Sequence, residues 1–134
     1  MADNEMTVDF PGGKRVTAHY NGFDILTDQG LKYGGDGSAP EPYDLFLASL
    51  ATCAGIYVLG FCAKRDIPTE GVRLVQRWQR DDKGKMVWLA IDIELPRDFP
   101  EQYRDAVVRA ASQCAVKKIL ESPPEMTVRT VTRD

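Results

Sequence analysis

One stretch of the chain limits its possible folds more than any other: Leu45–Ala63 runs for nineteen residues without a charged side chain. A helix of that length could span a bilayer. A bilayer would, however, split the rest of the chain into pieces of 44 and 71 residues, both small for a stable core. The stretch is also rich in Ala, Gly, Ser and Thr. We therefore favour a helix buried inside a protein over a membrane span.

A helix that is apolar all round needs cover on every side. A chain of 134 residues builds one hydrophobic core and has little spare sheet to wrap such a helix. A second copy of the chain would supply the missing cover, so we expect a homodimer of one domain covering residues 1–134. The alternative is a monomer with an unusually apolar central helix.

Composition excludes several function classes. The formal net charge is −3 and the pI is near 5.2, and no run of Lys and Arg exceeds two residues, so a nucleic-acid partner is not expected. The first eight residues carry two acidic side chains and no apolar stretch, unlike a secretory signal. We expect a cytoplasmic protein without membrane attachment.

The first third of the chain has the pattern of antiparallel strands. Met6, Val8 and Phe10 alternate with polar residues, and residues 15–20 form a second run. Asn21-Gly22 predicts a tight hairpin into a third strand at residues 23–27, because both residues tolerate positive φ. Residues 30–40 are glycine-rich and predict a loop without regular structure.

The rest of the chain predicts two helices and three further strands. The first helix starts at Pro42 and ends near Arg65, with Asp44 suited to its positive N-terminal end. Strands follow near residues 72–75 and 86–95, joined by a turn at residues 82–84. A second helix, capped by Asp98, extends through Cys114 to about Glu121. Residues 126–132 predict a last strand.

The cysteine thiols are the side chains of this chain best suited to carry out a reaction. Three cysteines and one histidine are present and no Cys-x-x-Cys pair occurs, so neither a metal site nor a bound cofactor is expected. Cys53 lies mid-helix, Cys62 lies about half a turn off its face, and Cys114 lies on the second helix. Each cysteine, taken singly, is more often an inert buried residue than a nucleophile.

A reactive cysteine has to be a thiolate, which a helix N-terminus or a nearby cation stabilises. Cys53 lies too far from the start of its own helix for that helix N-terminus to stabilise its thiolate. It therefore needs a cation, from Lys117 or Lys118 beside Cys114, or from Lys14 or Arg15 in the β region. The spacing does not choose among them.

Two motifs resemble a known family. Residues 35–40 (GDGSAP) with residues 44–53 (DLFLASLATC) are similar to the signature of the osmotically inducible protein C and organic hydroperoxide resistance family. Residues 111–116 (ASQCAV) are similar to its second cysteine motif, and the separation of 61 residues between Cys53 and Cys114 also fits.

The resemblance implies a fold and a reaction. The fold is α+β: an intertwined homodimer whose curved antiparallel sheets pack on two long central helices, with active sites at the dimer interface. The reaction is reduction of an organic hydroperoxide in defence against oxidative stress. Cys53 would become a sulfenic acid, Cys114 would resolve it as a disulfide, and a dithiol reductant would restore both thiols.

The chain departs from the family pattern at two positions. Family members carry a Glu ten residues before the first cysteine, where this chain has Tyr43; that Glu holds an Arg against the thiolate. Arg15 is the nearest candidate for the Arg, and Tyr43 and Asp44 are expected to rim the site. The family's Pro after the second cysteine is Ala115 here.

A function of a different class competes with the enzyme. The same fold could bind a small apolar molecule among Phe46, Ile56, Tyr57 and Val107, with structural cysteines and no peroxidase activity. The discriminating feature is whether a cation reaches Cys53.

Overall fold

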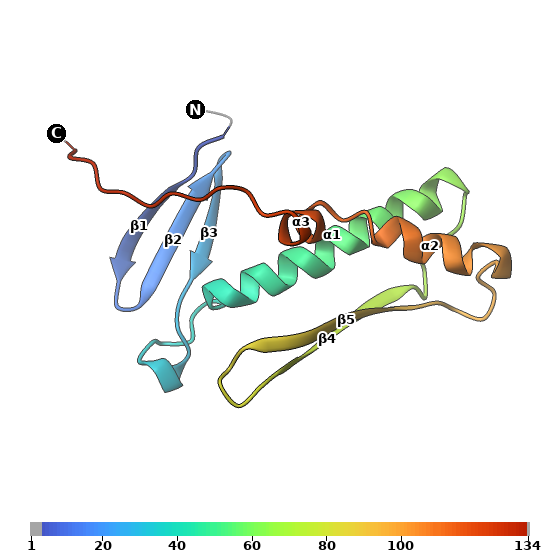
Figure 1. Cartoon of the computed structure of the whole chain (residues 1–134), viewed down its shortest axis with the longest axis horizontal. Coiled ribbons are helices and arrows are strands. Elements are labelled where there is room, and N and C mark those ends of the chain that lie inside the picture. The colour runs from blue at the N-terminus through green and yellow to red at the C-terminus, as the bar shows by residue number, and fades with distance from the viewer. Residues whose placement is uncertain (1–3, 134) are drawn as a thin grey trace. The chain divides into compact units, whose positions relative to one another are not determined.

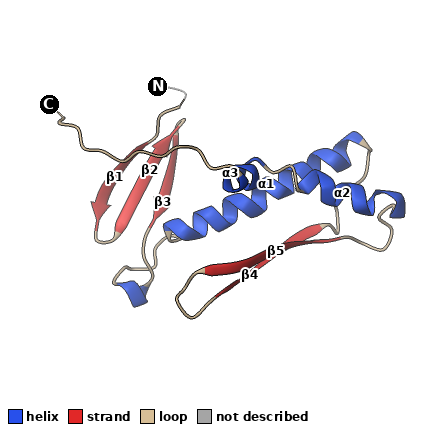
Figure 2. Cartoon of the chain, viewed as in Figure 1, coloured by secondary structure: helices blue, strands red, loops and turns tan. Residues whose placement is uncertain are grey.

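The computed structural model describes residues 4–133 as a mixed α+β fold (Figure 1). Its contacts divide the chain into two compact units, Met1–Ala48 and Ser49–Asp134. The first unit contains a three-stranded sheet and the start of a long helix. The second contains most of that helix, a two-stranded sheet and shorter helices (Figure 2).

The first sheet is an antiparallel meander of β1 (Thr7–Gly12), β2 (Arg15–Tyr20) and β3 (Phe23–Thr27). The predicted hairpin is confirmed: Asn21 and Gly22 have φ values of 50° and 82°, as a type I′ turn requires. The predicted loop at residues 30–40 is wrong in one detail, because Leu31–Tyr33 form a 3₁₀ turn, η1. Gly34 closes this turn with φ of 86°.

The two faces of this sheet differ in chemistry. Register places Ala18 between Val8 and Ile25, and Tyr20 beside Phe23, so one face is apolar. Val8 and Phe23 are 54% and 68% exposed. The opposite face carries His19, whose ring nitrogens lie 2.7 Å from the Asp24 carboxylate and 3.0 Å from that of Asp9. Hydrogen bonds to Asp24 and then Asp9 raise the pKa of His19.

The long helix α1 (Pro42–Lys64) begins at the predicted proline. The Asp44 carboxylate accepts a hydrogen bond from the Glu41 amide at 2.9 Å, which satisfies a donor at the helix start. Asp66, with φ of 53°, turns the chain after the helix, and the Ile67 amide bonds back to the Cys62 carbonyl. Among residues 4–133, α1 alone is long and apolar enough to cross a membrane by length and composition; buried core helices share that property.

The core of the second unit forms where α1 meets the segments that follow it. Its buried members are Val58, Phe61, Cys62, Phe99 and Val107. A hairpin of β4 (Arg73–Arg80) and β5 (Met86–Glu94) contributes Leu74 and Ile93 to the same cluster. Each large apolar side chain buried there contributes about 1.5–3 kcal/mol.

The predicted second helix is wrong as a single element. Residues 101–121 contain a 3₁₀ turn, η2 (Glu101–Tyr103), then α2 (Arg104–Ala111), a break, and α3 (Ala115–Glu121). Asp98 is not the cap, since Pro100 precedes η2. The break falls at Cys114, whose backbone is extended at φ −48° and ψ 125°. Burial of the Cys114 side chain outweighs the helical propensity of the surrounding residues.

The predicted last strand at residues 126–132 is also not observed. A strand needs a hydrogen-bonded neighbour, and residues 123–133 belong to no sheet in the described chain. Val128 is 96% exposed there. The alternating sequence alone is therefore not sufficient to form a strand in one copy of the chain.

Candidate active site

Cys53 and Cys114 meet in the second unit. The Cys53 side chain is half-buried, whereas Cys114 is almost completely buried. The Cys114 thiol donates to the carbonyl oxygen of Leu50, one helical turn before Cys53, at 3.9 Å, and it interacts with the Cys53 thiol closely enough to affect its pKa. All three cysteines are free thiols. Residues 61 positions apart thus form one thiol pair.

The two thiols differ in acidity. The hydrogen bond from Cys114 lowers the pKa of Cys53, and the backbone amides of Val116 and Ala115 lower it further. Burial raises the pKa of Cys114, and its hydrogen bond to Cys53 raises that pKa again. The two directions favour a proton on Cys114 and negative charge on Cys53. The role of Cys53 as the nucleophile of the pair stays a prediction.

The structure shows a source of activation that the sequence did not suggest. Two backbone amides that lower the pKa of Cys53 come from the start of a different helix, α3, which exists because the chain breaks at Cys114. The expected cation near Cys53 stays a prediction. Lys117, one of the expected cations, lies 3.8 Å from Glu121 and forms an ion pair with it. The sequence analysis did not single out Ala115 and Val116. The available signal was that the residue after Cys114 is Ala115 and not Pro, so that its backbone N–H can donate.

Cys62 does not belong to this site. It is fully buried among Val58, Phe61 and Val107, and burial raises the pKa of its thiol. Those are the properties of an inert core residue. That Cys62 does not pair with Cys53 stays a prediction.

Arg15 is held by the glycine-rich loop of its own unit. Its guanidinium lies 2.7 Å from the Asp36 carboxylate, and its Nε donates to the Ser38 hydroxyl at 3.2 Å. That hydroxyl in turn donates to the buried Asp28 carboxylate at 2.6 Å. The Ser38 hydroxyl, followed by backbone amides, lowers the pKa of Asp28 to about 2. Asp28, which sequence reasoning did not single out, thus orders the loop that binds Arg15.

The loop is an ordered element, and one of its glycines shows why. A Cβ on Gly35 would overlap the carbonyl oxygen of Gln29, so no other residue fits without moving the backbone. The neighbouring Tyr43 packs its ring on Phe46 with centroids 5.7 Å apart. The expected roles of Arg15, Tyr43 and Asp44 around the thiolate stay predictions.

One of the four residues expected to line the competing apolar ligand site is not accessible. Val107 is completely buried in the core of the second unit, so it cannot line an accessible pocket. One cavity of the second unit is lined by residues within 65–71 and 96–103. None of the four side chains expected for the apolar ligand lines this cavity.

Fold and thiol pair together define a class: α+β proteins in which one long helix presents a cysteine to a second cysteine at the start of a short helix. The family described as "OsmC-like protein" matches residues 35–129, and the chain belongs to that family. This confirms the resemblance seen in the motifs. No curated protein matches the chain.

Solved structures support the same fold. A candidate osmotic-stress-induced and detoxification-response protein from Psychrobacter arcticus is 22% identical with a TM-score of 0.72, covering 88% of this chain and 87% of that one. An organic hydroperoxide resistance protein from Legionella pneumophila is 18% identical with a TM-score of 0.54, covering 91% and 93%. A Vibrio cholerae protein described as a candidate of the same kind, with captopril in one of its active sites, is 16% identical with a TM-score of 0.53, covering 92% and 88%.

Proposed function

We propose that this protein is a thiol-dependent peroxidase that reduces organic hydroperoxides in defence against oxidative stress. The observation that carries the proposal is the asymmetric thiol pair, in which the Cys53 pKa is lowered and the Cys114 pKa is raised. A thiolate next to a protonated thiol is what formation and resolution of a sulfenic acid require. The similar proteins named for hydroperoxide resistance support the substrate class.

The proposed reaction has three balanced steps. The Cys53 thiolate attacks the outer oxygen of the hydroperoxide; the O–O bond breaks, and the alkoxide takes a proton and leaves as an alcohol. The Cys53 sulfenic acid then condenses with the Cys114 thiol, forming the disulfide and releasing water. A dithiol reductant reduces that disulfide to two thiols and becomes a disulfide itself.

A thiol titration tests this function directly. One equivalent of an organic hydroperoxide such as cumene hydroperoxide should lower the free thiols of the parent protein from three per chain to one, and dithiothreitol should restore three. Three free thiols after the same treatment would favour the binding function instead. Hydrogen peroxide serves as the matched probe, because it lacks the organic group and should react more slowly.

We further propose that the working form is a cytoplasmic, intertwined homodimer in which residues 1–134 act as one domain. Two apolar surfaces support it: the Val8 and Phe23 face of the first sheet, and the exposed side of α1, where Ile56 is 58% exposed. Uncovered apolar surfaces of this kind mark protein interfaces. Two copies would supply two long helices, and the unpaired segment at residues 126–132 would find a strand partner.

We expect light scattering at micromolar concentration to give about twice the 15.0 kDa of one chain. Ile56→Asp should shift the protein toward monomer or insoluble material, because a carboxylate would replace an apolar contact. Lys83→Asp, in the exposed turn between β4 and β5, is the control and should leave the dimer intact. A folded parent monomer under these conditions would rule the dimer out.

A further inference from the structure

A cavity in the second unit lies away from the thiol pair. It has a volume of about 480 Å³ and opens between residues 65–71, which follow α1, and residues 96–103, which precede α2. The last residue of α1, Lys64, is about 16 Å along the helix axis from Cys53 at about 1.5 Å per residue. The volume is within the usual range for small-molecule sites, and the proposed peroxidase reaction does not use it.

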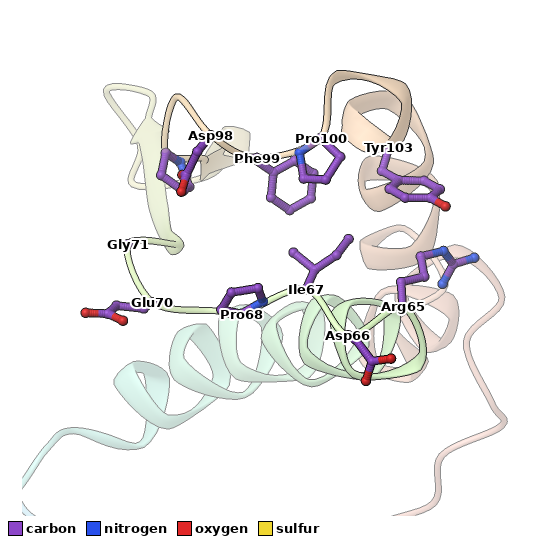
Figure 3. A pocket seen from close by; sticks show the side chains of 11 residues that line it. Arg65, Asp66, Ile67, Pro68, Glu70, Gly71, Asp98, Phe99, Pro100 and Tyr103 are labelled. Carbon is purple, nitrogen blue, oxygen red and sulfur yellow. The ribbon is translucent and has the colours of Figure 1, made fainter.

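The floor of this cavity is apolar and aromatic. Figure 3 shows the Phe99 ring and the Ile67 side chain pointing toward one another, with Pro68 and Pro100 beside them. Tyr103 continues the aromatic wall and makes an edge contact with Phe61, with ring centroids 5.8 Å apart. Phe99 is also part of the buried core, so the floor is fixed by the fold. Such a surface suits a flat or alkyl group of a ligand.

The charge around the cavity is unbalanced. Asp66, Glu70 and Asp98 all line it, and within residues 4–133 their side chains have no hydrogen-bond or ion-pair partner. All three carboxylates are exposed at the rim of the cavity, and Figure 3 shows Asp98 on the opposite side from Tyr103. Three negative charges that no side chain of the described part neutralises would favour a cation at the opening.

The single cation in the lining, Arg65, is already engaged. Its guanidinium lies over the Phe61 ring at 3.7 Å and within 5.4 Å of the Tyr103 centroid. Its Nη1 donates to the Phe61 carbonyl at 3.1 Å. Figure 3 shows it at the Tyr103 end, away from Asp98. Arg65 therefore holds the wall in place and leaves the carboxylates available.

We propose that this cavity binds small organic ammonium ions that carry an aromatic or alkyl group. The apolar part would lie against Phe99 and Ile67. The ammonium group would interact with Asp98 at the rim. The site is distinct from the thiol pair, since neither Cys53 nor Cys114 lines it.

Three probes with the same phenylethyl group and different charge test the proposal. In ¹⁵N-resolved NMR titrations of the whole protein, phenethylammonium should shift the amides of Gly71 and Phe99 at millimolar concentration. Phenylpropionate should bind at least about tenfold more weakly, because its carboxylate meets like charges, and phenylethanol should fall between them. Equal or tighter binding of phenylpropionate, or no shift with phenethylammonium, would overturn the proposal.

Asp98→Asn identifies the carboxylate, because it keeps the shape and removes the charge. Phenethylammonium should bind this variant about fivefold more weakly, while phenylethanol should bind it as it binds the parent. The control is Asp105→Asn on α2, which removes an exposed carboxylate outside the cavity and should leave both affinities unchanged. Unchanged phenethylammonium binding in Asp98→Asn would contradict the assigned role. Peroxide turnover should stay at the parent level in both variants, whether or not the proposed peroxidase function is correct.

Discussion

Cys53→Ser is expected to abolish hydroperoxide reduction completely, whereas Cys114→Ser should still react once. The reason is the asymmetry of the pair: hydrogen bonds lower the pKa of Cys53, and burial raises that of Cys114. After one equivalent of hydroperoxide, mass spectrometry should find a sulfenic acid at Cys53 of Cys114→Ser and no intrachain disulfide. The Cys53→Ser protein should stay unoxidised under the same dose.

Cys62→Ser is the matched control for both variants, because Cys62 is a free cysteine buried in the core. It should form the Cys53–Cys114 disulfide as the parent does. Oxidation of Cys114 in Cys53→Ser at the parent rate would falsify the proposed order of the two cysteines. Inertness of the parent and of all three variants would favour the binding function.

Ala115→Pro is expected to slow the reaction at neutral pH without unfolding the protein. Proline has no N–H, so the change removes one of the two backbone amides that stabilise the Cys53 thiolate. Ala115 is the first residue of α3 and is exposed, and proline fits the first position of a helix. The Ala115 amide is the smallest of the contributions that lower this pKa, so we expect a decrease of about two- to threefold in the thiolate at neutral pH.

The pH–rate profile gives the measurement for this variant. The thiolate is lost as pH falls through the Cys53 pKa, so a raised pKa moves the whole rising limb of the profile to higher pH. Ala115→Ser, which keeps the amide, should overlay the parent. At high pH, where Cys53 is ionised in all three proteins, the rates should converge. A profile of Ala115→Pro that coincides with the parent's would show that this amide does not act on the thiolate.

Both predictions depend on the break in the helix at Cys114, which the sequence did not reveal. The cysteine spacing and the motifs predicted which thiols matter, and alternation with Asn21-Gly22 predicted the first sheet almost residue by residue. The helical pattern of residues 98–121, however, continues through Cys114, and nothing local marks the break. The break depends on Cys114 being buried beside Leu50, a contact between residues 64 positions apart.

The same limit explains the other errors. Asp98 has the side chain of a good helix cap, but the chain starts its turn two residues later, after Pro100. Residues 126–132 have the alternation of a strand, but hydrogen-bonded pairing depends on a neighbour that sequence alone does not supply. The sequence shows where Cys53 lies in its own helix, but it does not show which other helix start lies nearby. Backbone donors can come from any such helix start.

The break between α2 and α3 also limits how much of the backbone would move when the proposed disulfide forms. A disulfide requires the two Cα atoms to lie within about 7 Å of each other. In a continuous helix, any backbone adjustment that the proposed disulfide needs would break several hydrogen bonds of the helix ladder. Here the Cys114 N–H donates a 3.3 Å bond to the Ala111 carbonyl, and the extended backbone of Cys114 already separates two short helices. In the proposed peroxidase cycle, such an adjustment would stay within a few residues, and the rest of the second unit would keep its packing.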